Sequence, residues 1–303
     1  MKLENFVSVN QLDHDDFWEL MALSKTLKQD LRAGKNRLIL PEKTLGMIFL
    51  KPSLRTRVSF EVGMTQMGGH AIYLGPNDIK LGERETTEDI ALVLSRYVDV
   101  IMARVFEHKT IEDLAEHSSI PVINGLSDFL HPCQALADFF SIYEVKRELE
   151  GLKLAFIGDG NNVAHSLMYA AALTGVKFTI ACPEGFEPAE EVINEAQKST
   201  SVEVCHEPEE AVVDADVIYT DVWASMGEED IAGEKKGRFR GFRVEPSLVG
   251  RAKEDVSVMH CLPAHYDEEI DQAVAHGPNS IVFEQAENRM HAQKALIALL
   301  MNS

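Results

Sequence analysis

The feature of the sequence that most constrains its fold is a regular alternation of short apolar runs with segments of helical spacing. The first apolar runs are TLGMIFL, HAIYLG, DVIMARV and PVINGL, and a helix-like segment follows each one. Parallel strands need long crossover connections, usually helices, whereas antiparallel strands can be joined by tight turns. The alternation therefore predicts parallel strands joined by helices.

A second series of the same kind begins at KLAFIGDG and continues through KFTIACP, VEVC, DADVIYTDV, VSVMHCLPA and SIVFEQ. The predicted fold class is α/β, with two doubly wound parallel-sheet domains of similar size and the active site between them. We expect one domain over residues 1–149, a second over 150–284, and a C-terminal helix over 285–303 that packs back on one of them, the first being the expected one. Ligands of such sheets gather at the carboxyl ends of the strands.

The charge balance excludes several kinds of partner. The chain has 29 Lys and Arg against 49 Asp and Glu, a formal net charge of −20. Such an acidic balance opposes binding to nucleic acid and to anionic membrane surfaces, so we expect neither partner. The acidic N-terminal segment has no long apolar run, which predicts a cytoplasmic protein. The 4 cysteines form no CxxC pair, which argues against a zinc ribbon and a disulfide scaffold.

The string LKPSLRTRVSFE is the strongest candidate for anion binding. A predicted strand ends and a helix begins across Ser53 to Arg57. Helix starts carry partial positive charge and unpaired N–H groups, hydroxyls can donate to an anion, and arginines can grip phosphate oxygens in pairs. An N-cap followed by two surface arginines would produce the same string. The ends of the neighbouring strands therefore decide between the two interpretations.

Those strand ends also carry polar side chains. Arg104 ends the run DVIMARV, and His131 follows the run PVINGL just before Pro132, a residue that suits a first helical turn. Gln134 lies inside the helix that begins there. His131 and Gln134 are suited to hydrogen bonds with a carbonyl oxygen and an amide-like group. Three such sites at successive strand ends favour an anion-binding pocket over three unrelated structural roles.

The string DVWASMG follows a strand of the second series and has the composition of an amino-acid site. Asp221 is suited to an ammonium group, while Ser225, Met226 and Gly227 offer hydroxyl and backbone donors to a carboxylate. Ordinary turn chemistry is the alternative, since Ser and Gly dominate loops.

Seven strings together resemble the motifs of the aspartate/ornithine carbamoyltransferase family. In order, they are SLRTR, MARVF, HPCQ, GDGNN, DVWASMG, HCLPA and ENR, and they cover residues 45–290. DVWASMG and HCLPA are similar to the members that act on ornithine. The resemblance implies a cytoplasmic transferase of amino-acid metabolism that moves the carbamoyl group of carbamoyl phosphate to the δ-amine of L-ornithine, giving L-citrulline and phosphate. It implies no cofactor and no metal.

The resemblance also assigns roles to residues of this sequence. For carbamoyl phosphate it implies Ser53, Leu54, Arg55, Thr56, Arg104, His131, Gln134, Cys261, Leu262 and Arg289. For ornithine it implies Asn162, Asp221, Ser225 and Met226. The catalytic roles fall to Arg55, Arg104, His131, Asp221 and Cys261. A homotrimer with shared active sites is expected, and Lys80 is our candidate for the carbamoyl phosphate-binding residue lent by a neighbouring chain.

One position departs from the family pattern. Leu54 stands where members that act on ornithine usually have Thr. If this position acts through its backbone N–H, replacing Thr by Leu has little effect on the affinity for carbamoyl phosphate. If the hydroxyl matters, affinity for carbamoyl phosphate falls and a modified ornithine becomes a more credible substrate.

Three other functions compete with this hypothesis. The first is a carbamoyltransferase for another amine or amino acid, such as putrescine or an acylated ornithine, and the second is a non-catalytic amino-acid-binding protein. The third is an NAD-dependent enzyme, since Gly158 and Gly160 follow a strand, but Val163 occupies the third glycine position of that fingerprint. The sequence leaves open whether the enzyme serves arginine biosynthesis or citrulline breakdown.

Overall fold

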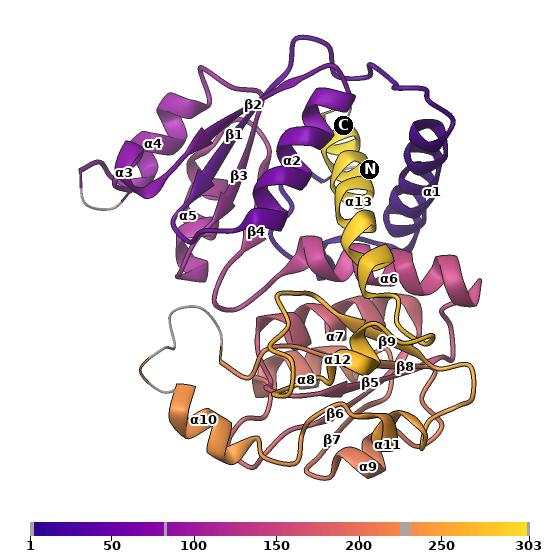
Figure 1. Ribbon diagram of the computed structural model, residues 1–303. Helices are drawn as coiled ribbons and strands as arrows, with labels where there is room; N and C mark the ends of the chain where they lie inside the picture. The colour runs from indigo at the N-terminus through magenta and orange to yellow at the C-terminus, as the bar shows by residue number, and fades with distance from the viewer. Residues whose placement is uncertain (1–2, 82–83, 225–229, 231, 302–303) are drawn as a thin grey trace. The chain divides into compact units, whose positions relative to one another are not determined.

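The computed structural model describes residues 3–81, 84–224, 230 and 232–301, which form two compact units (Figure 1). Unit 1 comprises Met1–Phe140 and Glu287–Ser303, and unit 2 comprises Ser141–Ala286. Each unit has one sheet, and every strand pair among the described residues is parallel. This confirms the predicted fold class of two α/β halves with parallel sheets.

The sheet of unit 1 has four strands in the order β2-β1-β3-β4. These are β1 (Thr44–Phe49), β2 (His70–Leu74), β3 (Val100–Arg104) and β4 (Val122–Leu126). All residues of β3 are buried, because helices cover both faces of the sheet. This explains why the strand reads as a continuous apolar run rather than as an alternating one.

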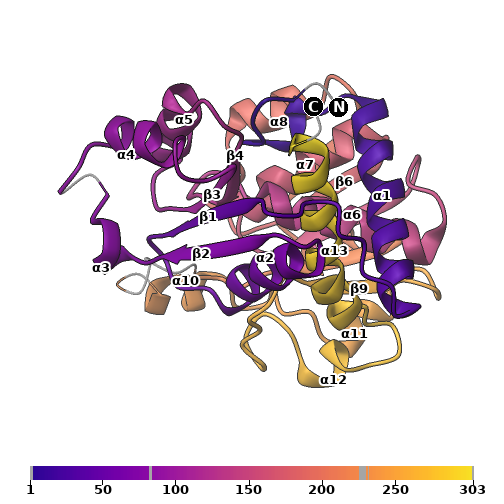
Figure 2. The same ribbon diagram turned by 90° about the horizontal axis from the view of Figure 1, so that it is seen from above.

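Helices α4 (Thr87–Leu94) and α5 (His108–His117) cover one face of this sheet and α2 (Leu54–Gln66) covers the other (Figure 2). Helix α13 (Val282–Met301) lies beside α2, where Lys294 donates to Gln66 at 2.9 Å. The remaining elements are the 3-10 helix Val9–Gln11, α1 (His14–Arg32), α3 (Pro76–Ile79) and α6 (Pro132–Lys146).

The sheet of unit 2 has five strands in the order β7-β6-β5-β8-β9. These are β5 (Lys153–Ile157), β6 (Lys177–Ala181), β7 (Val202–Cys205), β8 (Val217–Thr220) and β9 (Ser257–His260). Its helices are α7 (Asn162–Thr174), α8 (Glu190–Ala196), α9 (Pro208–Ala211), α10 (Ala232–Arg238), α11 (Pro246–Val249) and α12 (Gln272–Ala275). A core that includes Ile157, Ile218 and Val258 joins the sheet to Phe239, the residue directly after α10.

One predicted strand is wrong. The segment SIVFEQ, expected to continue the second series of strands, forms only an isolated parallel bridge between Ser280 and Val258 and then turns into α13 at Val282. Its apolar residues are too few to distinguish a strand from the first turn of a long helix.

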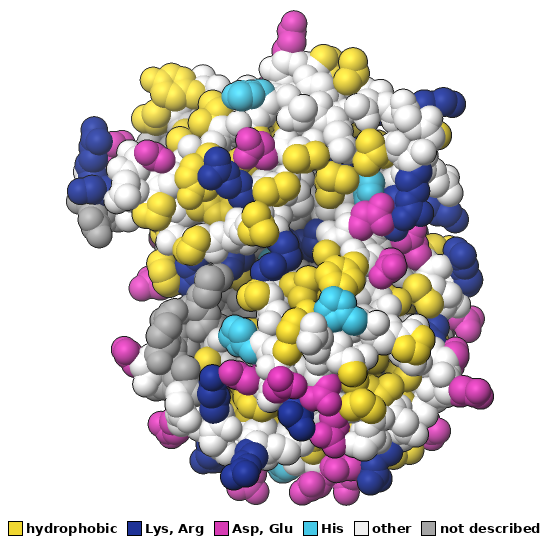
Figure 3. Space-filling view, viewed as in Figure 1, with side chains coloured by type: hydrophobic (Ala, Val, Ile, Leu, Met, Phe, Trp, Pro, Cys, Tyr) yellow, Lys and Arg dark blue, Asp and Glu magenta, His cyan; other side chains and the backbone are white. Residues whose placement is uncertain are grey.

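At the surface, the acidic side chains are interspersed with basic ones. Figure 3 shows acidic and basic side chains next to one another over unit 2. Some of them form ion pairs, such as Lys236 with Glu268 at 2.7 Å. Among the described residues, no helix is long and apolar enough to cross a membrane.

Candidate active site

The site residues of unit 1 lie at the point where its sheet topology reverses. From β1 the chain crosses to β2 on one side and later to β3 on the other, so the loops after β1 and β3 leave the sheet in opposite directions. Phe49 and Arg104, the last residues of these two strands, are direct neighbours in register. Open parallel sheets bind their ligands at this kind of crevice. The fold therefore brings Ser53–Thr56 and Arg104 together although they are far apart in the sequence.

Ser53 is the N-cap of α2. Its hydroxyl oxygen accepts from the Thr56 N–H at 3.3 Å, and its hydroxyl lies 3.0 Å from the Thr56 hydroxyl. The N-cap of the second interpretation is therefore present, while anion binding at this helix start stays a prediction. Arg57, the second arginine of SLRTR, pairs with Glu61 at 3.4 Å and stacks over the Tyr73 ring at 4.1 Å.

Arg289, from the ENR string on α13, is buried among polar side chains of α2 and α6. Its guanidinium donates to the side-chain oxygen of Gln134 and, at 3.5 Å, to the Thr56 hydroxyl. Gln134 in turn donates to the buried carboxylate of Asp138 at 2.7 Å. This chain of hydrogen bonds fixes the guanidinium, and it joins three residues that the sequence assigned to the same ligand.

His131 is buried beside three cations. Burial, and then the charges of Arg289, Arg104 and Arg55, hold the pKa of His131 well below its usual value of 6.5. The imidazole is therefore neutral at neutral pH, and it offers one N–H donor rather than a further positive charge. A neutral donor surrounded by three guanidiniums is suited to a substrate that combines a phosphate with a carbonyl oxygen.

Leu54 and Lys80 are both exposed. The Leu54 side chain is 74% exposed at the first position of α2, so only the backbone of this residue can serve a ligand held at the helix start. This favours the first of the two interpretations of the Leu-for-Thr change. Lys80 caps the C-terminus of α3 in a left-handed conformation, and in the described part of the chain it makes no hydrogen bond to another predicted site residue.

Unit 2 has the same topological reversal, between β5 and β8. The Ile157 and Thr220 ends of these strands are neighbours in register, and the predicted Asp221 follows directly. The Asp221 carboxylate accepts from the Cys261 thiol at 2.9 Å and from the Asn161 side-chain amide at 3.0 Å. Asp221 is nearly buried, whereas Cys261 is half-buried. The structure thus brings Asp221 and Cys261 together at one strand edge.

Asn161 is a residue that the sequence analysis missed in favour of its neighbour. It caps α7 by accepting from the N–H groups of Val163 and Ala164, and it holds Asp221 with its amide. Asn162, the predicted ornithine ligand, is half-buried at the first position of α7. The signal that could have found Asn161 is the strong preference of N-caps for Asn after a strand.

The histidine of HCLPA is engaged within the protein. His260 is buried, its Nδ1 atom accepts from the Leu262 N–H at 2.8 Å, and its Nε2 atom lies 3.1 Å from Glu269. Because Nδ1 is an acceptor, Nε2 carries the proton and donates to the carboxylate. His260 lies near Asp221 and Cys261, but both of its nitrogens are occupied, so this group is unsuited to a metal ion. The Leu262 N–H is likewise occupied, which leaves its carbonyl oxygen as the group that a ligand can use.

The glycine-rich turn after β5 is filled by the chain itself. A Cβ atom on Gly160 would lie 2.2 Å from the Pro188 nitrogen, and the Gly160 N–H donates to the Phe186 carbonyl at 2.9 Å. A dinucleotide-binding turn uses its glycines to let a pyrophosphate approach the helix start. Here the backbone around Pro188 and the Asn161 cap take that space, which argues against the NAD-dependent alternative.

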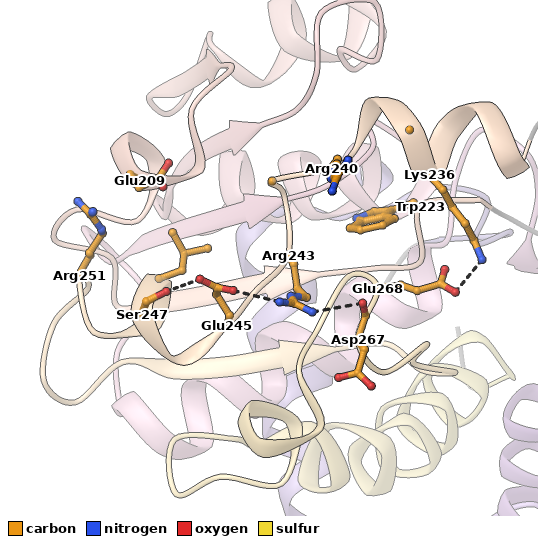
Figure 4. Close-up of a pocket in the computed structure, with 13 residues that line it drawn as sticks. Glu209, Trp223, Lys236, Arg240, Arg243, Glu245, Ser247, Arg251, Asp267 and Glu268 are labelled. Carbon is orange, nitrogen blue, oxygen red and sulfur yellow. Dashed lines mark hydrogen bonds and ion pairs between the residues drawn. The ribbon is translucent and has the colours of Figure 1, made fainter.

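The predicted ornithine ligands Ser225 and Met226 lie outside the described residues. Beyond them, helix α10 is anchored to the rest of unit 2, since Lys235, which is nearly buried, pairs with Asp159 at 2.7 Å. A separate hollow of about 840 Å³ lies beside this helix. Its lining side chains include the ion pair of Arg243 with Glu245 (Figure 4). Its lining contains Trp223 but neither Asp221 nor Cys261.

The chain belongs to the aspartate/ornithine carbamoyltransferase family. The carbamoyl-P binding domain of that family matches residues 4–144, and its Asp/Orn binding domain matches residues 150–300. The first of these domains contains the strand ends of Ser53, Arg104 and His131, and the second contains those of Asp221 and Cys261. The class of enzyme that the resemblance implied is thereby confirmed.

Among members of this family, the similarity to ornithine carbamoyltransferases extends over the whole chain. The chain is 53% identical to the ornithine carbamoyltransferase of Pyrococcus abyssi, covering 99% of this chain and 96% of the other. It is 54% identical to the anabolic ornithine carbamoyltransferase of Pyrococcus furiosus, over 95% and 93% of the two chains. The solved structure of the Pyrococcus furiosus enzyme superposes with a TM-score of 0.96 at 52% identity, covering 99% of this chain and 97% of that one.

Proposed function

We propose that the residues at the two strand edges carry out the transfer of a carbamoyl group from carbamoyl phosphate to the δ-amine of L-ornithine. Unit 1 holds carbamoyl phosphate through Ser53, Arg55, Thr56 and the backbone of Leu54, together with Arg104, His131, Gln134 and Arg289. Unit 2 holds ornithine through Asn162 and Asp221, joined by Ser225 and Met226, and Cys261 lies beside the reacting amine. The observation that carries this proposal is the burial of His131, Arg104 and Arg289 in unit 1, with Arg289 hydrogen-bonded to Gln134 and Thr56.

The chemistry requires an uncharged amine. An alkyl amine resembling that of Lys titrates near pH ~10.4, so its neutral form costs on the order of 4 kcal/mol at neutral pH. Nearby cations and desolvation favour the neutral form. The arginines that bind the phosphate supply these cations, and they also neutralise the phosphate as it leaves.

The carbamoyl oxygen gains negative charge as the amine attacks. Arg104, the N–H of neutral His131 and the Thr56 hydroxyl are the donors that we assign to this oxygen. The Thr56 oxygen already accepts from Ser53 and Arg289, which leaves its hydroxyl hydrogen to donate to the substrate. A donor of this kind is typically worth about 3 kcal/mol of barrier. The carbonyl oxygen of Leu262 is suited to the carbamoyl NH2 group, since its own N–H is occupied.

The amine is oriented from unit 2. Asp221 is held by Cys261 and Asn161, so its carboxylate is fixed for an ammonium or amine group. A covalent intermediate on Cys261 is not needed, because the amine is itself a competent nucleophile. Cys133 is unsuited to such a role as well, since burial raises the pKa of its thiol to about 12.

The nearest alternative is a carbamoyltransferase for an acylated ornithine. An acetylornithine transcarbamylase structure superposes with a TM-score of 0.88, but at 28% sequence identity. Free ornithine is favoured because the relatives that are about twice as similar are ornithine carbamoyltransferases. One of them is anabolic by name, which supports a role in arginine biosynthesis for this chain as well.

The test is a colorimetric ureido assay with carbamoyl phosphate and a panel of ornithine, acetylornithine, putrescine and aspartate. We expect citrulline formation to exceed every other product by at least tenfold. Arg55→Ala should abolish turnover while the melting temperature stays near that of the wild type. Preference for another amine would overturn the assignment of the substrate, and a fully active Arg55→Ala enzyme would remove Arg55 from the site.

We also propose a homotrimer with shared active sites. The exposed face of α2 supports self-association, because Leu54, Val58 and Val62 repeat at helical spacing and are 74%, 48% and 38% exposed. Contiguous exposed apolar residues commonly mark interfaces between chains. Mixed trimers of Arg55→Ala and Lys80→Ala chains test the lent residue: recovered activity supports Lys80, and none would count against it.

Four free cysteines fit a reducing compartment, so we propose a cytoplasmic location.

A further inference from the structure

The buried lysine of α1 is a charged group in unit 1 that the proposed mechanism does not use. Lys28 is 3% exposed, and its ammonium donates to the Asn288 side-chain oxygen at 2.6 Å. Asn288 is fully buried and directly precedes Arg289 on α13. The same ammonium lies 3.6 Å from the Glu287 carboxylate and 5.8 Å from the centre of the Phe140 ring. All three residues of ENR are therefore tied either to α1 or to the carbamoyl phosphate residues.

Stability alone does not explain a charge in this place. Removing an ammonium from water costs several kcal/mol, and a well-packed apolar side chain of similar length is often as stabilising or more so. A methionine at position 28 would fill the same space between α1 and α13 without that cost. What the lysine adds over an apolar side chain is a fixed orientation of its partner Asn288, because a charge-assisted hydrogen bond is short and strongly oriented.

We propose that Lys28 is a positioning residue for Arg289. By holding Asn288, it sets the rotation and height of the first turns of α13, and so the place at which the Arg289 guanidinium meets Gln134 and Thr56. The Gln293 amide, one turn further along, adds to this when its oxygen faces Arg289: it accepts from the guanidinium at 3.1 Å and 3.2 Å and donates to Ser59 at 2.6 Å. A displacement of about 1 Å in such a group can cost up to about 100-fold in rate.

The variant that tests this is Lys28→Met, and the chain offers a matched control. Arg32 lies one turn further along α1 and pairs with Glu287 at 2.9 Å, but it is 62% exposed and does not contact Asn288. We expect Lys28→Met to lower kcat/KM for carbamoyl phosphate by about tenfold while KM for ornithine stays within about twofold. Arg32→Met should change neither value. Unchanged kinetics with carbamoyl phosphate in Lys28→Met would overturn the proposal.

A double-mutant cycle separates positioning from general destabilisation. If Lys28 acts through Arg289, Lys28→Met should have little further effect on carbamoyl phosphate in an Arg289→Met background. Fully multiplicative effects of the two changes would contradict the proposal. Asn288→Ala removes the other partner of the same hydrogen bond and should reproduce the tenfold loss, which keeps the idea testable if Lys28→Met does not fold.

This inference rests on the proposed function, since the effect is measured with carbamoyl phosphate. The two can fail separately. A wild-type protein without carbamoyl transfer would refute the proposed function. An active wild type whose Lys28→Met and Asn288→Ala variants are equally active would refute only the role of Lys28.

Discussion

The Cys261 thiol donates to the Asp221 carboxylate at 2.9 Å, and the Asn161 amide donates to the same carboxylate at 3.0 Å. Two neutral side-chain donors, together with the Val222 N–H at 2.8 Å, therefore orient one anion at the carboxyl ends of neighbouring strands, β8 and β9. None of these donors neutralises its charge, which leaves that charge for a cationic or amine-bearing ligand. The arrangement predicts different consequences for removing the anion and for removing a donor.

Asp221→Asn should weaken ornithine binding and spare carbamoyl phosphate. A hydrogen bond to a charged group is worth about 1.5–3 kcal/mol, so we expect the dissociation constant for ornithine to rise about 10- to 100-fold. Cys261→Ser keeps a donor to Asp221 and should have a smaller effect. Calorimetry with each substrate measures both. Equal weakening of the two ligands by Asp221→Asn would contradict the division of roles between the units.

The depressed pKa of His131 predicts a stability that depends on pH. Above pH 6.5 the imidazole is neutral in both the folded and the unfolded chain, and the folded state has its full stability. Below that value the unfolded chain binds the proton first, because burial and the neighbouring arginines hold the folded pKa well below 6.5. Stability is therefore lost as the pH falls from 6.5 towards the folded pKa.

The measurement is the melting temperature of the wild type and of His131→Gln between about pH 7.5 and about pH 5.0. We expect the melting temperature of the wild type to fall further on acidification than that of the variant, which has no imidazole at this position. Parallel curves for the wild type and His131→Gln would refute the prediction.

The exposure of Leu54 predicts that its side chain is dispensable for substrate binding. Leu54→Thr should leave KM for carbamoyl phosphate within about twofold, because the backbone N–H at a helix start binds an anion whatever the side chain is. The same variant removes the most exposed apolar residue of the α2 face. We therefore expect Leu54→Thr to weaken the association of the chains, measured by sedimentation, and to leave the kinetics unchanged. A tenfold fall in KM would show instead that a hydroxyl serves the substrate.

The pattern of the sequence was sufficient for most of the fold. Strands such as β3, β8 and β9 are buried along their whole length, so each appears as an apolar run, and helices follow because parallel strands need crossovers. The failure at SIVFEQ has a physical cause: Ser280 does pair with Val258, but only for one bridge before α13 begins. A short apolar run carries no information about where such pairing stops.

The site was predictable to the extent that it depends on strand ends. Ser53, Arg104, His131 and Asp221 all follow strands, and a strand end is visible in the sequence. The contacts of Asn161 and Lys28 were not predictable, because each is a hydrogen bond between elements brought together by the fold. Arg289 was found only through the resemblance of ENR to the family, since nothing in a single helix shows which residues it will face.

Gly160 is predicted to be required for the fold of unit 2 rather than for cofactor binding. An added Cβ would lie 2.2 Å from the Pro188 nitrogen and 2.4 Å from the Glu187 carbonyl carbon, both backbone atoms that cannot rotate away. Gly160→Ala should therefore lower the free energy of unfolding by at least about 3 kcal/mol. Gly237→Ala is the control, because its Cβ would meet nothing within 4 Å and Ala favours the helix. Denaturant unfolding measures both variants, and a Gly160→Ala protein as stable as the wild type would show that the backbone around Pro188 does not fill this turn.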